Sequence, residues 1–367
     1  MAKNYVSKLP RDIREYFHIL SPNYPEWLND YINTPEMLRL QHVSNLCGCQ
    51  FLAIWDTPRS YSILDHSIAC ALIVWHFTNN KAQTLAALFH DISSPAFKHC
   101  IDIMNGDAKK QESTEHYTYR MLKNAKKIRR LLKRDGIKLK EVKDYRLYPI
   151  ADNDMPKLSS DRLEYTFMNA YLVRDYKATL PLSKIKKLYQ NIIIGKNEVG
   201  EEELAFSDYK IARQFIDIAQ KLWPNWCNNR YRLVAKYYAD ILKRSIKAKD
   251  LTLEDLYLLD DDKIINILKK SKDKTIRIDI EKFIKAKKWH EGSKKPADSK
   301  YCITNYAIKH RYIDPLVCTS YDLDVHSGQE QISFKRLSII SPQAKQCINQ
   351  IKKYKSPKYA WFDFDML

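Results

Sequence analysis

Thr84-Leu85-Ala86-Ala87-Leu88-Phe89-His90-Asp91 is the stretch that decides the fold and locates the chemistry. Its apolar run predicts a helix over 81–91 that ends in an imidazole followed by a carboxylate, where a core helix would otherwise continue. A His-Asp dipeptide carries little weight alone, because a buried His paired with a carboxylate is often structural. Its meaning therefore depends on the residues that accompany it.

Composition favours a helical globular protein. The chain has 367 residues, of which 45% are hydrophobic, enough for one large domain or two of ordinary size. Only 7 Gly accompany 24 Tyr and abundant Lys, Leu and Ile, which favours long helices over a turn-rich β architecture. We therefore expect a mainly α fold.

The net charge of +18, from 62 basic and 44 acidic residues, suits a surface that attracts polyanions. Nucleic acid and nucleotide phosphates both fit, but lysines spread along expected helices more often form a solvated face. The 8 scattered cysteines indicate reduced thiols and a cytoplasmic protein. The sequence contains no apolar run of about 18 residues and no charged-then-apolar N-terminus. Neither a membrane partner nor a signal peptide is therefore expected.

The order of apolar segments predicts four parts. These are an N-terminal arm or strand pair (1–34), a helical core (35–180), a helical extension with a small hairpin (181–288) and a C-terminal α+β region (289–367), with 289–300 as the linker. Helices are expected at 35–46, 64–75, 81–91, 97–104, 113–133, 161–176, 207–223, 228–246, 252–258 and 261–270, with Ser113 and Ser160 among the expected caps.

Short β-like runs complete the pattern. A hairpin is expected from strands at 192–194 and 204–206. In the C-terminal region the runs are 312–313, 316–317, 332–334 and 337–340, before a last helix at 342–353.

Four residues in the order His66, His90, Asp91 and Asp161 stand on, or at the ends of, separate expected helices. Two helices joined by a short turn at 79–80 would bring His66 and His90-Asp91 to the same end of an antiparallel pair. Asp161, in the first turn of its own helix, then completes the set. Imidazoles and carboxylates held on rigid facing helices are a typical set of ligands for a divalent metal.

This order resembles the HD superfamily of metal-dependent phosphohydrolases, and an HD-domain helical bundle is the fold that the resemblance implies. Several motifs resemble its deoxynucleoside triphosphate triphosphohydrolase branch, over roughly residues 35–320: Arg39-Leu40-Gln41-His42-Val43, Tyr61 to Ala69, His90-Asp91-Ile92, Phe97-Lys98-His99, Asp161-Arg162-Leu163-Glu164-Tyr165, Ala212-Arg213-Gln214-Phe215, Leu258 to Ile264 and His310-Arg311-Tyr312-Ile313-Asp314-Pro315.

The resemblance implies a role for each matching residue. His66, His90, Asp91 and Asp161 would bind a divalent metal, which Mn, Fe, Mg, Ni, Co or Zn all satisfy. Arg162 would bind substrate at a phosphate and Tyr165 at the sugar, with Lys98 as a further candidate phosphate contact. The candidate catalytic residues are His99, Asp102 and Glu115, and His116 is a candidate to replace the family's catalytic His.

The reaction implied is attack by a metal-activated water on the α-phosphorus of a nucleotide, releasing a deoxynucleoside and triphosphate. Family members often assemble into oligomers, so a homo-oligomer is expected.

Three positions depart from the family pattern. Ile63 stands where a phosphate-binding Arg is usual, Ser94 replaces an active-site His, and Thr114 occupies the position of a catalytic His when the segment is aligned on Glu115. Other basic residues would then have to hold phosphate: Lys98, Arg162, Arg213, Arg230 or Arg232.

Two alternatives stay open beside the triphosphohydrolase. The chain is a phosphohydrolase of other phosphoesters, such as a nucleoside monophosphate or a phosphodiester, or it is a catalytically weak regulatory protein that binds nucleotides or nucleic acid. For the latter, aromatic residues interleaved with basic ones at 223–232 and 353–359 are candidates to stack on bases.

Overall fold

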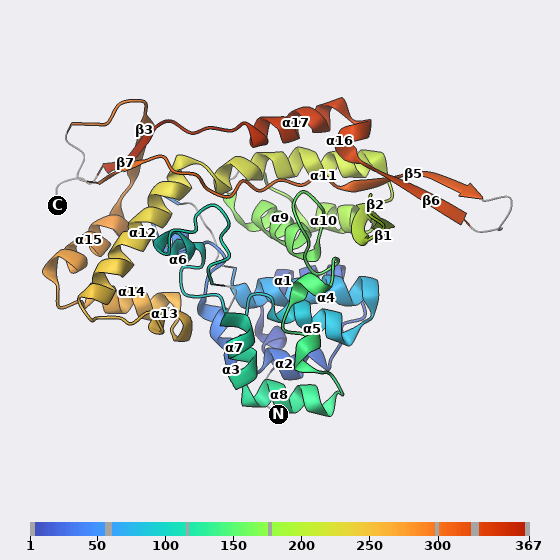
Figure 1. Cartoon of the computed structure of the whole chain (residues 1–367), viewed down its shortest axis with the longest axis horizontal. Coiled ribbons are helices and arrows are strands. Elements are labelled where there is room, and N and C mark those ends of the chain that lie inside the picture. The colour runs from blue at the N-terminus through green and yellow to red at the C-terminus, as the bar shows by residue number, and fades with distance from the viewer. Residues whose placement is uncertain are drawn as a thin grey trace.

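The computed structural model describes residues 4–55, 61–114, 117–174, 178–297, 301–323 and 330–363. It is a mainly helical assembly with a small sheet part, which confirms the expected fold class (Figure 1). Among these residues, no helix is both long and apolar enough to cross a membrane.

Helix α4 (Ile63–Thr78) lies at the centre of the core, with every residue from Ile63 to Val74 buried. Its N-terminus carries a capping box between Ser62 and Asp65, which satisfies backbone donors that the helix leaves free. Asn79 then takes a left-handed conformation and Asn80 caps α5 (Lys81–Phe89). The predicted antiparallel pair is therefore confirmed, and α9 (Ser160–Leu172) packs against α4.

The N-terminal segment is helical. The strand pair predicted in 1–34 is wrong, because α1 (Arg11–Leu20) and α2 (Leu28–Ile32) occupy the segment and bury Tyr16 and Tyr31 completely. The aromatic residues that suggested anchors belong to the hydrophobic core. The next helix, α3 (Pro35–Arg39), is shorter than predicted because the chain tightens into a 3₁₀ turn at Leu40–His42.

Three short helices follow the central pair: α6 (His99–Met104), α7 (Tyr117–Asn124) and α8 (Lys126–Arg134). The single helix predicted over 113–133 is wrong, because the chain leaves helical geometry at Ala125, between α7 and α8. The N-cap of α9 is Ser159 and not Ser160, since the Ser159 hydroxyl accepts from the Arg162 amide at 3.3 Å.

The extension begins with α10 (Leu182–Tyr189) and the predicted hairpin, formed by β1 (Ile192–Lys196) and β2 (Glu202–Phe206) in antiparallel pairing. The predicted helices follow as α11 (Tyr209–Leu222), α12 (Asn229–Lys247), α13 (Asp255–Leu258) and α14 (Asp261–Lys269), then α15 (Lys274–Lys285). Further 3₁₀ turns in the described part of the chain are Val6–Lys8, Cys49–Phe51, Leu139–Glu141, Tyr145–Leu147 and Trp223–Trp226.

The strands of the C-terminal region belong to two small sheets. Strand β5 (Leu316–Leu323) pairs in parallel with β2 and antiparallel with β6 (Glu330–Arg336), giving the order β1-β2-β5-β6. The second sheet has the order β3-β7-β4, from Lys288–Gly292, Tyr359–Asp363 and Cys302–Thr304, and lies at the opposite end of the molecule in Figure 1.

The strand predictions here are partly wrong. Residues 312–313 form no strand, and 337–340 form the short helix α16 (Leu337–Ile340) before the predicted last helix, α17 (Pro342–Lys352). Strand β3 also lies within the predicted linker 289–300.

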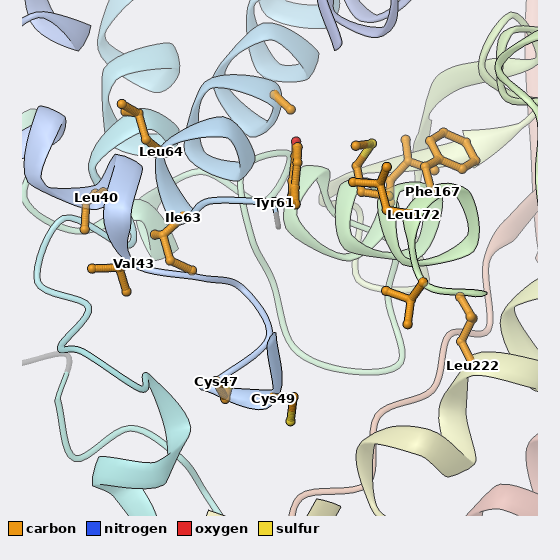
Figure 2. Packing of buried hydrophobic residues seen from close by; sticks show 14 of the residues in the cluster. Leu40, Val43, Cys47, Cys49, Tyr61, Ile63, Leu64, Phe167, Leu172 and Leu222 are labelled. Carbon is orange, nitrogen blue, oxygen red and sulfur yellow. The ribbon is translucent and has the colours of Figure 1, made fainter. Parts of the chain in front are cut away.

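One cluster of buried hydrophobic side chains runs from Ile13 to Phe362. Part of it is seen in Figure 2, where Leu40, Val43 and Ile63 gather at the start of α4. Gly48 is required close by, since its φ is +85° and a Cβ there would lie 2.6 Å from the Tyr238 ring. The four-part division of the chain stays a prediction.

Candidate metal centre

The imidazoles of His66 and His90 face each other across the end of the α4–α5 pair. Their Nε2 atoms lie 3.3 Å apart. His66 is 1% exposed and comes from the first turns of α4, whereas His90 is the C-cap of α5. The antiparallel packing of the two helices brings the rings together, as the sequence predicted.

Each imidazole is fixed by a partner on its far side. Nδ1 of His90 lies 2.6 Å from the carbonyl oxygen of Ala87, and Nδ1 of His66 contacts the Glu164 carboxylate. A carbonyl and a carboxylate only accept, so both Nδ1 atoms carry the proton and donate it. This arrangement directs both Nε2 atoms to one point, as in metal-binding histidines whose other nitrogen is held by an outer partner.

Two carboxylates approach the same point. Asp161 Oδ1 lies 3.0 Å from His66 Nε2 and 3.7 Å from His90 Nε2, while Asp91 Oδ2 lies 3.9 and 3.5 Å from the same two atoms. Ligand atoms about 2.1 Å from a shared divalent cation lie roughly 3–3.5 Å from one another, so this spacing fits a metal centre. All four predicted ligands are thus brought together.

The electrostatics of the cluster favour a cation. Burial opposes ionisation of Asp91 and Asp161, yet Lys98 and the two imidazoles hold the pKa of Asp91 well below its usual range, and His66 does the same for Asp161. Burial also opposes protonation of His66, but Cys70 and Glu164 raise its pKa well above the usual value. Positive charge is therefore stabilised between His66 Nε2 and Asp161, where a metal would lie.

Cys70 is a neighbour of the centre that the sequence did not single out. Ligand atoms of His66, Cys70, His90 and Asp161 lie within 4.8 Å of one another. The Cys70 sulfur is, however, 3.8 and 3.7 Å from the two ring nitrogens of His66, which places it over the ring and not along the Nε2 lone pair. Burial raises the pKa of its thiol to about 12, which disfavours the thiolate that binds metals. The two imidazoles and the two carboxylates therefore remain the candidate ligand set.

His99 and Asp102 form a second pair in the same pocket. Nδ1 of His99 lies 3.0 Å from Asp102 Oδ2, and the Ser113 hydroxyl donates to Asp102 Oδ1 at 2.7 Å. Burial lowers the pKa of His99 to about 4, so the ring is neutral near pH 7 and its Nε2 accepts from Arg311 at 3.3 Å. In this state Nδ1 of His99 donates to Asp102 and Nε2 accepts from Arg311, so the ring has no proton to give at Nε2.

The three predicted substrate-binding residues all line the pocket. Lys98 Nζ lies 2.8 Å from Asp91 Oδ2 and donates to Asn45. Arg162 uses Nε and Nη2 to hold the loop at 152–157, through the Lys157 carbonyl, Asn153 and Asp152. Their phosphate contacts stay predictions, as does the contact of Tyr165 with the sugar. Glu115 and His116 lie outside the described residues.

Two of the positions that depart from the family pattern, Ile63 and Ser94, have structural roles. Ile63 is completely buried in the core. Ser94 Oγ donates to Asp91 Oδ1 at 3.1 Å, so it orients a predicted ligand. Ser93 bonds the Thr118 hydroxyl at 2.8 Å.

The pocket over the metal centre has a volume of about 190 Å³. Its walls combine aromatic side chains with basic ones, among them Tyr145, Tyr165, Trp226, Lys309 and Arg311. Three arginines proposed as substitute phosphate ligands have other partners: Arg213 contacts Asp217 and Ser341, Arg230 lies over the Trp55 ring, and Arg232 donates to Ser356.

Glu164 is the main residue of the centre to which the sequence assigned no role. It is completely buried and accepts from Tyr61 at 2.7 Å and Tyr16 at 3.4 Å, as well as from His66. The sequence could have indicated it, because Glu164 follows Asp161 by three residues and residues three apart lie on the same face of a helix.

Comparison with known proteins supports this picture, although no protein-family model matches the chain. The uncharacterized protein YdhJ of Bacillus subtilis is 21% identical over 253 residues, 68% of this chain and 73% of that protein. The metal-dependent phosphohydrolase cns2 of Cordyceps militaris is 30% identical over 145 residues, 39% of this chain and 40% of that protein.

Two crystal structures share the fold. A phosphohydrolase from Bacteroides thetaiotaomicron has a TM-score of 0.62 at 12% identity, with 92% of this chain and 96% of that chain covered. A hypothetical protein from Aquifex aeolicus has a TM-score of 0.58 at 17% identity, with 93% of each chain covered. The chain is therefore similar over part of its length to a metal-dependent phosphohydrolase, and it shares its fold with a phosphohydrolase of known structure.

Proposed function

We propose that this chain is a metal-dependent phosphohydrolase of nucleotides, with deoxynucleoside triphosphates as the leading substrates. The observation that carries the proposal is the convergence of His66, His90, Asp91 and Asp161 on one point, with the outer nitrogens of both imidazoles already bonded. When bound there, a divalent cation polarises a phosphoryl oxygen and lowers the pKa of water.

The residues around the centre prepare it for that chemistry. Glu164 keeps His66 in one tautomer, and Ser94 and Lys98 hold the two oxygens of Asp91. Positions fixed in this way reduce the reorganisation needed when charge develops on a phosphoryl group. Lys98 also contributes positive charge beside the site where that group would lie.

The pocket walls favour a nucleotide over a simple phosphate ester. Tyr145, Tyr165 and Trp226 offer flat apolar surface for a base or sugar, and Lys309 and Arg311 offer positive charge for phosphates. The resemblance to the triphosphohydrolase branch adds the expected products, a deoxynucleoside and triphosphate.

A smaller phosphoester is the second candidate, and the size of the pocket favours it. A volume of about 190 Å³ lies below the roughly 300 Å³ at which pockets for drug-sized ligands begin. A nucleoside monophosphate needs fewer cationic side chains around its phosphate than a triphosphate does. Ile63 stands where the family usually has one of these, a phosphate-binding Arg. Nucleic-acid binding has less support, because Trp223, one of the aromatics predicted to stack on bases, is buried. A homo-oligomer stays part of the proposal.

The test is a product assay on the purified chain with Mn²⁺. We expect triphosphate release from at least one deoxynucleoside triphosphate, and none from the variant His90→Ala/Asp91→Ala. Orthophosphate release from nucleoside monophosphates alone would select the second candidate. Salt-sensitive oligonucleotide binding without turnover on any substrate or metal would refute the enzyme.

A further inference from the structure

Arg311 enters the pocket from the segment between β4 and β5. The amide of Lys309 donates to the Ala108 carbonyl at 3.1 Å, which docks this segment on the loop after α6. Nη2 of Arg311 then lies 2.6 Å from Gln111 Oε1 and 3.3 Å from His99 Nε2. Two neutral acceptors thus hold the guanidinium in the same pocket as the metal centre.

Gln111 is held in an unfavourable state. It is 4% exposed, and its φ of +60° lies in the left-handed region that non-glycine residues rarely adopt. Its Oε1 is used by Arg311, so the Nε2 amino group points elsewhere and is buried without a partner among the described residues. Burying such a donor without a partner destabilises the fold, and a ligand acceptor would recover that loss.

The charge of Arg311 is also uncompensated. Other arginines near the pocket or the sheets meet carboxylates, such as Arg162 with Asp152 and Arg336 with Glu203. Within the described ranges, no carboxylate forms an ion pair with Arg311, and its neighbour His99 is neutral. A half-buried cation beside an unpaired amide donor is complementary to an anion that only accepts hydrogen bonds.

We infer that Arg311 and Gln111 bind a phosphate oxygen of the substrate, Arg311 by a charge-assisted hydrogen bond and Gln111 through Nε2. Together, Gln111 and Arg311, the latter from the C-terminal quarter of the chain, supply the anion contact that Ile63 cannot make. The inference rests on the proposed function, because it assigns the substrate of that function a phosphate group in this part of the pocket.

Binding of inorganic phosphate to the Mn²⁺-loaded full chain, measured by isothermal titration calorimetry, tests the inference without turnover. Arg311→Gln should raise the phosphate Kd by about tenfold or more, and Gln111→Met by about threefold or more. Arg244→Gln is the matched control, since Arg244 forms a surface ion pair with Asp279 at 2.7 Å. It should leave the Kd unchanged.

An Arg311→Gln variant that binds phosphate within twofold of the wild type overturns the inference, as does a wild-type chain that binds no phosphate. If Arg311→Gln does not fold, Arg311→Lys decides, because it keeps the charge but loses the planar guanidinium. A Kd raised about threefold supports the inference and an unchanged Kd overturns it.

The outcome for the proposed function is read separately. If Arg311→Gln loses phosphate binding and the wild type hydrolyses nothing, only the proposed phosphohydrolase activity is refuted. Wild-type hydrolysis with an unchanged KM in Arg311→Gln refutes only the anion site. A deoxynucleoside, which lacks phosphate, should bind the wild type and Arg311→Gln equally. If the substitution weakens the binding of the deoxynucleoside as much as the binding of phosphate, the inference is overturned.

Discussion

Nε2 of His66 and Nε2 of His90 lie 3.3 Å apart, while the Nδ1 atom of each is bonded on the opposite side of its ring. The rings meet at 71°, so they are not stacked on one another. Two lone pairs directed at one point repel unless a positive charge lies between them. The folded chain therefore holds both imidazoles in the geometry that a cation stabilises.

Loss of one imidazole should remove the metal. We expect His90→Ala to lower the affinity for Mn²⁺ by more than about 100-fold, because a ligand itself is lost and not only its outer partner. Metal content after dialysis, measured by mass spectrometry, checks this. His18→Ala, at an exposed position on α1, is the control and should retain the metal of the wild type.

Glu164→Gln tests the outer partner of His66. A carboxamide can turn its NH₂ toward Nδ1, which would force the proton onto Nε2, so we expect metal affinity to fall about 10–100-fold. Glu203→Gln is the matched control, because Glu203 is equally buried but bonds Arg336 at 2.6 Å. It should lower the free energy of unfolding without changing metal affinity. Equal metal affinity in Glu164→Gln and the wild type would contradict the proposed role.

The free energy of unfolding should decrease as the pH is lowered, because His99 is held in its neutral form in the folded chain. Its folded-state pKa is about 4, below the ordinary value of 6.5, so between these values the unfolded chain binds the proton and the folded chain does not. The free energy of unfolding should therefore drop by about 2 kcal/mol from pH 7.5 to 5 on account of this ring. Urea unfolding of the wild type and of His99→Gln at both pH values measures the difference. Parallel losses in the two proteins would refute it.

Gly48→Ala should destabilise the fold by about 3 kcal/mol or more. The methyl group would meet Tyr238 at 2.6 Å and Phe97 at 2.7 Å, in addition to the cost of a φ of +85°. Gly106→Ala isolates the second term, because its φ is +84° and an added Cβ meets nothing within 4 Å. That variant should lose only about 1 kcal/mol in denaturant unfolding.

The meeting of the four candidate metal ligands could be predicted because the position of each depends on local order. The apolar run of α4 and the short turn at Asn79-Asn80 fix where His66 and His90 meet, and helix periodicity places Asp161 and Glu164 on one face. The resemblance to a known family then led to the interpretation of these residues as metal ligands.

Contacts between segments far apart in the sequence could not be predicted from such local patterns. Arg311 meets Gln111 across 200 positions, and β2 finds its parallel partner β5 over more than 100. The helical N-terminus was missed for a related reason, because the polar residues between Tyr16 and Tyr31 hide the burial that tertiary packing gives both rings. Strand and helix were likewise confused at 337–340, where four residues carry too little periodicity to separate them.

The parallel pairing of β2 with β5 also has a consequence for biosynthesis. All four metal ligands lie between residues 66 and 161, but Lys309 and Arg311 close the pocket from a segment that β5 anchors. As the chain emerges from the ribosome N-terminus first, the ligands can assemble well before the wall opposite them exists. A nascent chain stalled before residue 300 should therefore bind metal yet remain unable to retain an anion.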